Sequence, residues 1–237
     1  MIINLSHQKG GTGKSTLAYN LTRAFHIMGY KVKLLDLDSQ NTCVNINELR
    51  EEELDYIVNI EHKEDLIEEI NTHNEDEIII IDSGGFDSNI TRLAIQGADI
   101  NLTPVADKVT EVLAVTKKYS LILEDLAKET NDDIRTYILL NKIHIFATDF
   151  KHIENNIAHQ ERMNLVMRKK VVKNKEVEIP LIIRDRGIYD KSLIEGKTVQ
   201  EANDLKGHEA ASDEMEKLAK ALIEIDKKDN KWVKLKN

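Results

Sequence analysis

The chain has 237 residues, with 33 Lys and Arg against 42 Asp and Glu, which gives a formal net charge of −9 at pH 7. This length suits one domain with a substantial hydrophobic core. The apolar runs are too short for a membrane-spanning helix, and the single cysteine, Cys43, excludes a disulfide framework and a multi-cysteine metal or cluster site. We expect no secretion signal, because the N-terminus opens directly into a strand-like segment, and we therefore expect a cytoplasmic protein.

Short β-rich runs alternate with helical stretches along the chain. The predicted strands cover residues 2–5, 32–35, 78–81, 100–102, 137–140 and 181–183, and the predicted helices cover 16–28, 64–71, 111–128, roughly 156–172 and 213–226. The four isoleucines at 78–81 are typical of a central parallel strand that is buried on both faces. This alternation predicts an α/β fold with a doubly wound, mainly parallel sheet flanked by helices. We expect one domain over residues 1–226, a solvated acidic surface at 48–77, and a solvated basic tail at 227–237.

The strongest motif lies between the first predicted strand and the first predicted helix. Its sequence is Lys9-Gly10-Gly11-Thr12-Gly13-Lys14-Ser15-Thr16. Glycines allow successive backbone N–H groups to wrap a phosphate, and the N-terminus of the following helix adds partial positive charge. Lys14 would reach the outer phosphates, and the Ser15 hydroxyl would bind Mg²⁺. Gln8 replaces the first glycine of the usual phosphate loop, and a second lysine, Lys9, opens the motif. We therefore predict a nucleotide site formed by residues 10–16.

Acidic residues follow two of the predicted strands, where ligands of parallel sheets bind. Asp82 follows the isoleucine run and would hold a Mg²⁺-bound water. Asp36 or Asp38 could do the same, or could orient the water that attacks a γ-phosphate. The residues by themselves leave these alternatives open.

Several motifs in the right order resemble those of the ParA/MinD family of P-loop ATPases. The loop K-G-G-x-G-K-S/T resembles the deviant Walker A motif of that family. Residues 36–40, Asp-Leu-Asp-Ser-Gln, resemble its D-x-D-P-Q motif with Ser39 in place of proline, and residues 78–82 resemble its Walker B strand. A further segment, residues 183–199, is similar to one found in plasmid-partition ParA proteins. The resemblance extends from Met1 to about Glu201 and is closest to small ParA proteins without an N-terminal helix-turn-helix.

The resemblance implies roles for individual residues. Lys14 and Asp38 would be catalytic, Asp38 by orienting the attacking water, and Lys9 would reach the nucleotide of a partner subunit. Ser15, Asp36 and Asp82 would hold Mg²⁺, and the amide of Asn141 would bind adenine. From the residues by themselves, Lys9 could equally be a surface lysine before a turn, and Asn141 could simply end its strand.

The implied function is ATP-driven DNA partition in plasmid or chromosome segregation, with ATP and Mg²⁺ as cofactors. ATP would hold a sandwich homodimer together, the dimer would bind nonspecific DNA on the nucleoid or assemble further, and a centromere-binding partner protein would stimulate slow hydrolysis. Basic residues that could contact DNA phosphates cluster at Arg162, Arg168, Lys169, Lys170, Lys173 and Lys175, followed by Arg184, Arg186, Lys191 and Lys197.

Two other functions remain open. A membrane-associated positioning ATPase of the MinD type would need an amphipathic C-terminal helix, and the tail around Trp232 has no helical apolar stripe, so we expect no membrane partner. A P-loop metabolic ligase is disfavoured by Lys9 and by the D-x-D-x-Q segment. We expect His7 and Cys43 to be structural or incidental, because neither belongs to a catalytic constellation.

Overall fold

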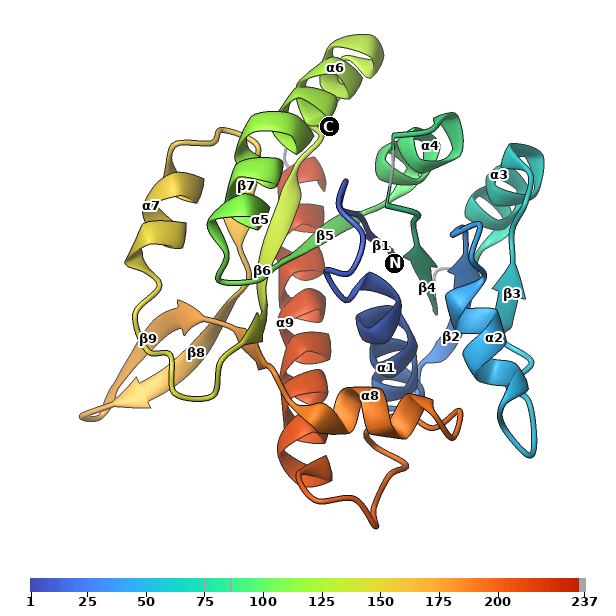
Figure 1. Cartoon of the computed structure of the whole chain (residues 1–237). Coiled ribbons are helices and arrows are strands. Elements are labelled where there is room, and N and C mark those ends of the chain that lie inside the picture. The colour runs from blue at the N-terminus through green and yellow to red at the C-terminus, as the bar shows by residue number, and fades with distance from the viewer. Residues whose placement is uncertain (75, 86, 235–237) are drawn as a thin grey trace.

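The computed structural model describes residues 1–74, 76–85 and 87–234, and its centre is a parallel sheet (Figure 1). The sheet order is β10-β6-β5-β1-β4-β2-β3, with β7 also paired to β6. All of its strand pairs are parallel, which confirms the predicted fold class. Its strands are β1 (Ile2–Leu5), β2 (Lys31–Asp36), β3 (Ile57–Asn59), β4 (Glu77–Asp82), β5 (Ile100–Val105), β6 (Thr136–Ile143), β7 (Met163–Leu165) and β10 (Ile182–Arg184).

Helices cover both faces of this sheet. They are α1 (Lys14–Ile27), α2 (Thr42–Glu48), α3 (Lys63–Thr72), α4 (Asn89–Gly97), α5 (Val109–Ala114), the π-helical turn η1 (Val115–Tyr119), α6 (Ser120–Thr130), α7 (Lys151–Ala158), α8 (Gly187–Leu193) and α9 (His208–Lys234). A separate antiparallel pair, β8 (Met167–Val172) and β9 (Lys175–Pro180), projects from the body (Figure 1).

The isoleucine run is the central strand that the sequence predicts. Ile78 and Ile80 of β4 belong to the core that includes α1 and α9, whereas Ile79 and Ile81 belong to the core that includes α3 and α4. Side chains of a strand alternate between its two faces, so a continuous apolar run is what a strand covered on both faces needs. Because β4 lies between β1 and β2, it carries Asp82 to the middle of the sheet edge.

The prediction of a helix near residues 156–172 is wrong. The chain forms α7, which ends at Ala158, and then enters β7 and β8. Val171 and Val172 favour strand because their branched side chains fit an extended backbone. Lys173 and Asn174 both take positive φ, 49° and 62°, which is the backbone of a two-residue hairpin turn. The strand preference of the valines and the tight turn at Lys173 and Asn174 therefore determine the structure of this segment.

The remaining predicted elements differ from the structure mainly in their ends. The helix predicted at 111–128 lies in the continuous stretch α5-η1-α6, and the segment predicted as a solvated acidic surface contains β3 and α3, with Leu66 buried. The expected domain end at residue 226 falls inside α9, which continues to Lys234, while residues 235–237 of the expected tail lie outside the described residues. In the described part of the chain, no helix has both the length and the hydropathy to cross a bilayer.

Candidate functional site

The predicted phosphate loop connects the end of β1 to the start of α1. Gly13, directly before α1, has φ of +91°, and Gly11 has φ of +76°. Both values lie in the left-handed region that glycine enters without steric cost. No side chain among the described residues caps α1, so its first N–H groups remain available to a ligand. This is the backbone arrangement that binds phosphate.

Asp36 and Asp82 lie side by side at the carboxyl edge of the sheet. They are registered neighbours on β2 and β4, and both are fully buried. Burial raises the pKa of Asp82 to about 7, and the charge of Asp36 adds to the rise, while Ser15, Lys14 and Cys43 oppose it. Asp82 Oδ1 is buried without a hydrogen-bond partner among the described residues. The acidic residues predicted at the ends of two strands therefore lie next to each other, at the ends of β2 and β4.

Asp36 is already engaged by backbone N–H groups. Its Oδ2 accepts hydrogen bonds from the N–H of Cys43 (2.8 Å) and Val44 (3.2 Å), and its Oδ1 accepts from the N–H of Asp38 (3.1 Å). Burial raises the pKa of Asp36, and these three donors work against that rise. The carboxylate thus anchors the first turn of α2 and the loop that carries Asp38.

Asp38 lies beyond the buried pair and is half-buried. Its Oδ1 accepts a hydrogen bond from the N–H of Gln40 at 3.0 Å, which fixes the turn that follows β2. Asp38 is therefore the more accessible of the two acids in the D-x-D-x-Q segment.

Cys43 has a defined place under the loop, which the sequence did not reveal. It is fully buried, and its thiol donates to Asp82 Oδ2 at 3.4 Å and to the Ser15 carbonyl at 3.7 Å. Burial raises the pKa of Cys43 well above its usual value, which keeps it a neutral thiol. The expectation of a structural role is consistent with this packing.

The two lysines of the motif have different surroundings. Lys14 is only 6% exposed, and burial lowers its pKa while Asp82 and Asp38 oppose that change. The Lys9 side chain is 44% exposed, and its Nζ lies 3.7 Å from Glu111 Oε1 and 3.4 Å from Thr110 Oγ1. Lys14 therefore belongs to the cradle, whereas Lys9 lies on its rim.

His7 contacts the backbone of the loop at Lys9. Its Nδ1 accepts a hydrogen bond from the N–H of Lys9 at 2.8 Å. Burial lowers the pKa of His7 to about 4, and the charges of Lys14 and Lys9 add to the effect, so the ring is neutral at pH 7. His7 acts here as a structural contact of the loop.

Two neighbouring side chains at the end of β6 brace the phosphate loop. Asn141 Nδ2 donates to the carbonyl of Thr12 at 2.8 Å, and Lys142 Nζ donates to the carbonyl of Gly11 at 2.9 Å. Asn141 also borders a cavity of about 270 Å³ whose lining includes Gly13 and Arg184. The amide predicted to bind adenine thus lies at the cavity and holds the loop. The contact made by Lys142 was missed, because residues this far apart in the chain give no local signal.

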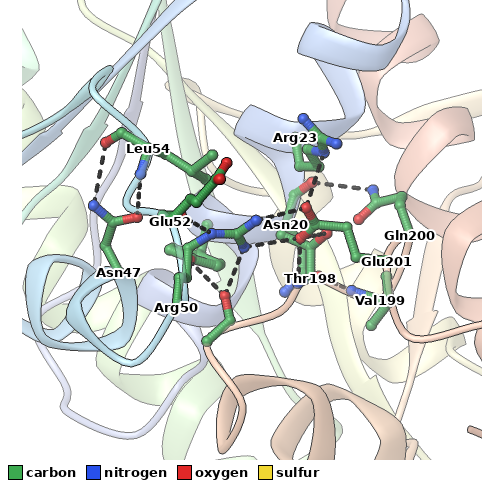
Figure 2. A network of polar contacts seen from close by, with 12 residues as sticks. Asn20, Arg23, Asn47, Arg50, Glu52, Leu54, Thr198, Val199, Gln200 and Glu201 are labelled. Carbon is green, nitrogen blue, oxygen red and sulfur yellow. Dashed lines mark hydrogen bonds and ion pairs between the residues drawn. The ribbon is translucent and has the colours of Figure 1, made fainter.

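A polar network locks α1 to the end of α2 (Figure 2). Arg50 makes a bidentate pair with Glu201, at 2.8 and 3.0 Å, and also donates to the carbonyl of Gly196 at 2.8 Å. On the α1 side, Tyr19 donates to the same carbonyl at 2.8 Å, and Asn20 accepts from the N–H of Val199 at 2.8 Å. The helix that follows the phosphate loop and the helix that follows Asp38 are therefore held by one cluster.

The predicted basic cluster is divided by the fold. Arg162 pairs with Asp133 at 3.3 Å, Arg186 pairs with Glu214 at 2.8 Å, and Lys197 pairs with Glu195 at 2.7 Å. Arg184 donates to two backbone carbonyls. Five residues of the predicted cluster remain together, on β8, β9 and the turn between them: Arg168, Lys169, Lys170, Lys173 and Lys175.

Comparison with known proteins identifies the family of this chain. The family described as the CobQ/CobB/MinD/ParA nucleotide binding domain matches residues 3–199. Aquifex aeolicus MinD cell division protein is similar in fold, with a TM-score of 0.65, 18% identity and coverage of 94% of this chain and 96% of that one. A protein assigned to plasmid partition in Borrelia burgdorferi, bound to AMPPNP, has a TM-score of 0.62, 15% identity and coverage of 94% and 98%. Pyrococcus horikoshii MinD with Mg-ADP has a TM-score of 0.62, 15% identity and coverage of 92% and 95%. The chain belongs to the CobQ/CobB/MinD/ParA family of nucleotide-binding domains.

Proposed function

We propose that this protein is an ATPase of DNA partition that dimerises when it binds ATP. The observation that carries the proposal is the unequal placement of its two loop lysines. Lys14 is buried in the cradle, where it neutralises phosphate charge, and a second cation inside the cradle would be redundant. Lys9 is exposed on the rim, from which it can supply charge to a nucleotide held by a second copy, as an arginine finger does.

The buried edge of the sheet suits a Mg²⁺–nucleotide complex. Asp82 Oδ1 lacks a partner among the described residues, and the Ser15 side chain is close enough to lower the pKa of Asp82. No group of three or more His, Cys, Asp or Glu side chains in the described residues is placed to hold a metal. The Ser15 hydroxyl and the Asp82 carboxylate supply oxygen ligands, and Mg²⁺ typically takes one or two carboxylates together with phosphates and waters. Bound Mg²⁺ would neutralise the charge that develops on the phosphates.

The protein's own groups would divide the work of hydrolysis. Ser15 and Asp82 would hold the metal, with Asp36 adding negative charge from a carboxylate that three backbone N–H groups already hold. Residues 10–16 would bind the phosphates, and Asn141 with the neighbouring cavity would receive the base. Asp38, the accessible acid, would orient the attacking water. Turnover would be slow until a centromere-binding partner protein completes the site.

Dimerisation would make the nucleotide a switch. The γ-phosphate would hold the two subunits together, and its loss would release them. The dimer would bind nonspecific DNA in the cytoplasm, at the nucleoid. The Borrelia relative assigned to plasmid partition and bound to AMPPNP supports this reading, whereas the MinD relatives equally support a positioning ATPase. The latter would act at a membrane and remains the second candidate.

Light scattering of the purified chain with ADP, ATP and nonhydrolysable ATP tests the proposal. We expect the mass to double only with ATP or its nonhydrolysable analogue. Asp38→Ala should still bind ATP and dimerise but not hydrolyse it, and Lys9→Ala should bind ATP without dimerising. Lys63→Ala, which removes an exposed lysine of α3, is the matched control. A chain that stays monomeric with every nucleotide would refute the switch, and normal dimerisation of Lys9→Ala would refute the role of Lys9 in trans.

Liposome co-sedimentation separates the two candidates. Nucleotide-dependent binding to anionic vesicles, without binding to DNA, would favour the positioning ATPase over DNA partition.

A further inference from the structure

The β8–β9 hairpin is an excursion from an edge strand. β7 and β10 both pair with β6, at successive positions along it: Leu165 lies opposite Ile138, and Ile182 lies opposite Leu140. Where the chain leaves and returns, the N–H of Leu181 donates to the carbonyl of Val166 at 2.8 Å. The hairpin is therefore an insertion into what would otherwise be one continuous edge strand. The pairing of β7 and β10 with β6 does not depend on it.

The hairpin adds little to the core. Every residue from 169 to 178 is exposed, and Figure 1 shows the two strands extending away from the body. The exposed part keeps its shape through strand pairing and through the tight turn at Lys173 and Asn174. An ordered element that buries so little apolar surface is suited to contacting another molecule rather than to folding.

Charge is segregated between the two faces of this ribbon. Strand alternation and the register place Arg168, Lys170 and Lys175 on one face together with Val172, Val177 and Ile179, and this face has no acidic residue. We call it the basic face. The opposite face carries both acids of the hairpin, Glu176 and Glu178.

The acids of the opposite face are already paired. Glu176 lies 3.6 Å from Lys169, and Glu178 lies 3.7 Å from Lys228 of α9. For Arg168, Lys170, Lys173 and Lys175, by contrast, the structure gives no ion pair with any described residue. The opposite face of the ribbon therefore contacts α9 through Glu178, whereas Lys170, Lys173 and Lys175 are exposed. Arg168 is half-buried and borders a cavity that α9 also lines.

We propose that the basic face and the turn lysine of the β8–β9 ribbon bind the phosphate backbone of duplex DNA. The hairpin carries five basic residues and two acids in a chain of net charge −9, so it is a locally cationic segment that attracts a polyanion. A two-stranded ribbon also has the width that the major groove of B-DNA admits. Lys170 and Lys175 are exposed diagonal neighbours on this face, about 7–8 Å apart, so they can meet separate phosphates.

This inference names the DNA-contacting surface of the proposed function and rests on that function only for the choice of partner. An anionic membrane fits less well, because the basic face contains valine and isoleucine but none of the aromatic anchors that favour a lipid interface. Two ribbons in a dimer would double the number of phosphate contacts without any change in either ribbon.

Fluorescence anisotropy of the full chain with a labelled random-sequence duplex, over a series of salt concentrations, tests the ribbon. Each phosphate contact contributes about 0.9 to the slope of log K against log salt. The double variant K170A/K175A should therefore lower that slope by about 1.8 and weaken binding at 0.1 M salt by a factor on the order of 50. Lys169→Ala, on the opposite face of the same ribbon, is the matched control and should leave the slope nearly unchanged.

The outcomes separate this proposal from the switch. Equal slopes for the wild type and K170A/K175A would overturn the ribbon as the DNA contact, as would wild-type binding to anionic vesicles but not to DNA. ATP turnover and ATP-dependent dimerisation should be unaffected in K170A/K175A, because the ribbon lies outside the nucleotide site. Ribbon-dependent DNA binding by a chain that neither dimerises nor hydrolyses ATP would refute the proposed switch and leave the ribbon assignment standing.

Discussion

Replacing Glu201 by glutamine tests whether the Arg50–Glu201 cluster stabilises the fold through charge. Burial by itself would raise the pKa of Glu201, but hydrogen bonds from Arg50 and Thr198 outweigh it and lower the pKa from 4.5 to about 2. The side chain is 17% exposed, so solvent screening is modest. Lowering the pKa from 4.5 to about 2 corresponds to about 3 kcal/mol of stabilisation of the folded state. Glu201→Gln keeps the shape and removes the charge, so most of this free energy should be lost at pH 7.

The pH dependence identifies the mechanism. Because the folded-state pKa is lowered, the stabilisation is present above pH 4.5 and is lost as the pH falls towards 2. The difference in free energy of unfolding between the wild type and Glu201→Gln should be about 3 kcal/mol at pH 7 and roughly half of that at pH 3. At pH 7 the variant should melt about 6–12 °C below the wild type, as expected for a domain of this size.

Urea unfolding followed by circular dichroism at pH 7 and pH 3 measures both values. Glu195→Gln is the control, because Glu195 lies in the same segment and pairs with Lys197 on the exposed surface. It should leave the free energy of unfolding nearly unchanged. If Glu201→Gln were as stable as the wild type at pH 7, or if its deficit were the same at both pH values, the cluster would not stabilise the protein through charge.

Two further predictions concern the nucleotide site. Asp82→Asn should stabilise the nucleotide-free protein by an amount that grows from about pH 4 to about pH 7 and is complete above pH 7, because burial raises the pKa of Asp82 from 3.8 to about 7. Thermal melting in EDTA should show the full gain at pH 8 and little at pH 4, and a gain that is equal at both would contradict this prediction. Gly13→Ala should destabilise the fold by about 1–3 kcal/mol and weaken ATP binding, because φ there is +91° and a Cβ would lie 2.7 Å from Asn141 Nδ2. Urea unfolding and nucleotide titration measure both effects, and Gly187→Ala, where a Cβ meets open space, is the control.

Local signals explain what the sequence predicted well. The glycine-rich loop and the isoleucine strand each fit within a few consecutive residues, so their composition reports directly on backbone shape and burial. In a parallel sheet the carboxyl ends of the strands lie at one edge. The position of Asp36 beside Asp82 therefore follows from the fold class. Fold class and the neighbouring positions of Asp36 and Asp82 were therefore accessible from the sequence, whereas the roles of these residues stay predictions.

Contacts between distant residues explain what was missed. Lys142 meets the Gly11 carbonyl across 131 positions of the chain, and Cys43 meets Asp82 across 39, so neither contact leaves a periodic trace. The prediction of a helix in place of the hairpin failed for a different reason. Its basic residues suit an exposed helix face and an exposed ribbon equally, and only the turn at Lys173 and Asn174 distinguishes the two.

Glu111 should set the threshold at which Lys9 becomes available to a second subunit. Its carboxylate is buried, accepts a hydrogen bond from the N–H of Ala106 at 2.8 Å, and lies 3.7 Å from Lys9 Nζ. A half-exposed pair at this distance is worth at most about 1 kcal/mol, so Glu111→Gln should lower the ATP concentration needed for dimerisation by up to about fivefold. The glutamine can still accept from Ala106, which keeps the loop in place. The double variant with Lys9→Ala separates release of Lys9 from a change elsewhere: if Glu111 acts through Lys9, the double variant behaves as Lys9→Ala does. An added effect of Glu111→Gln in the Lys9→Ala background would show that Glu111 influences dimerisation by another route, and the Lys9–Glu111 pair would then have no role in assembly.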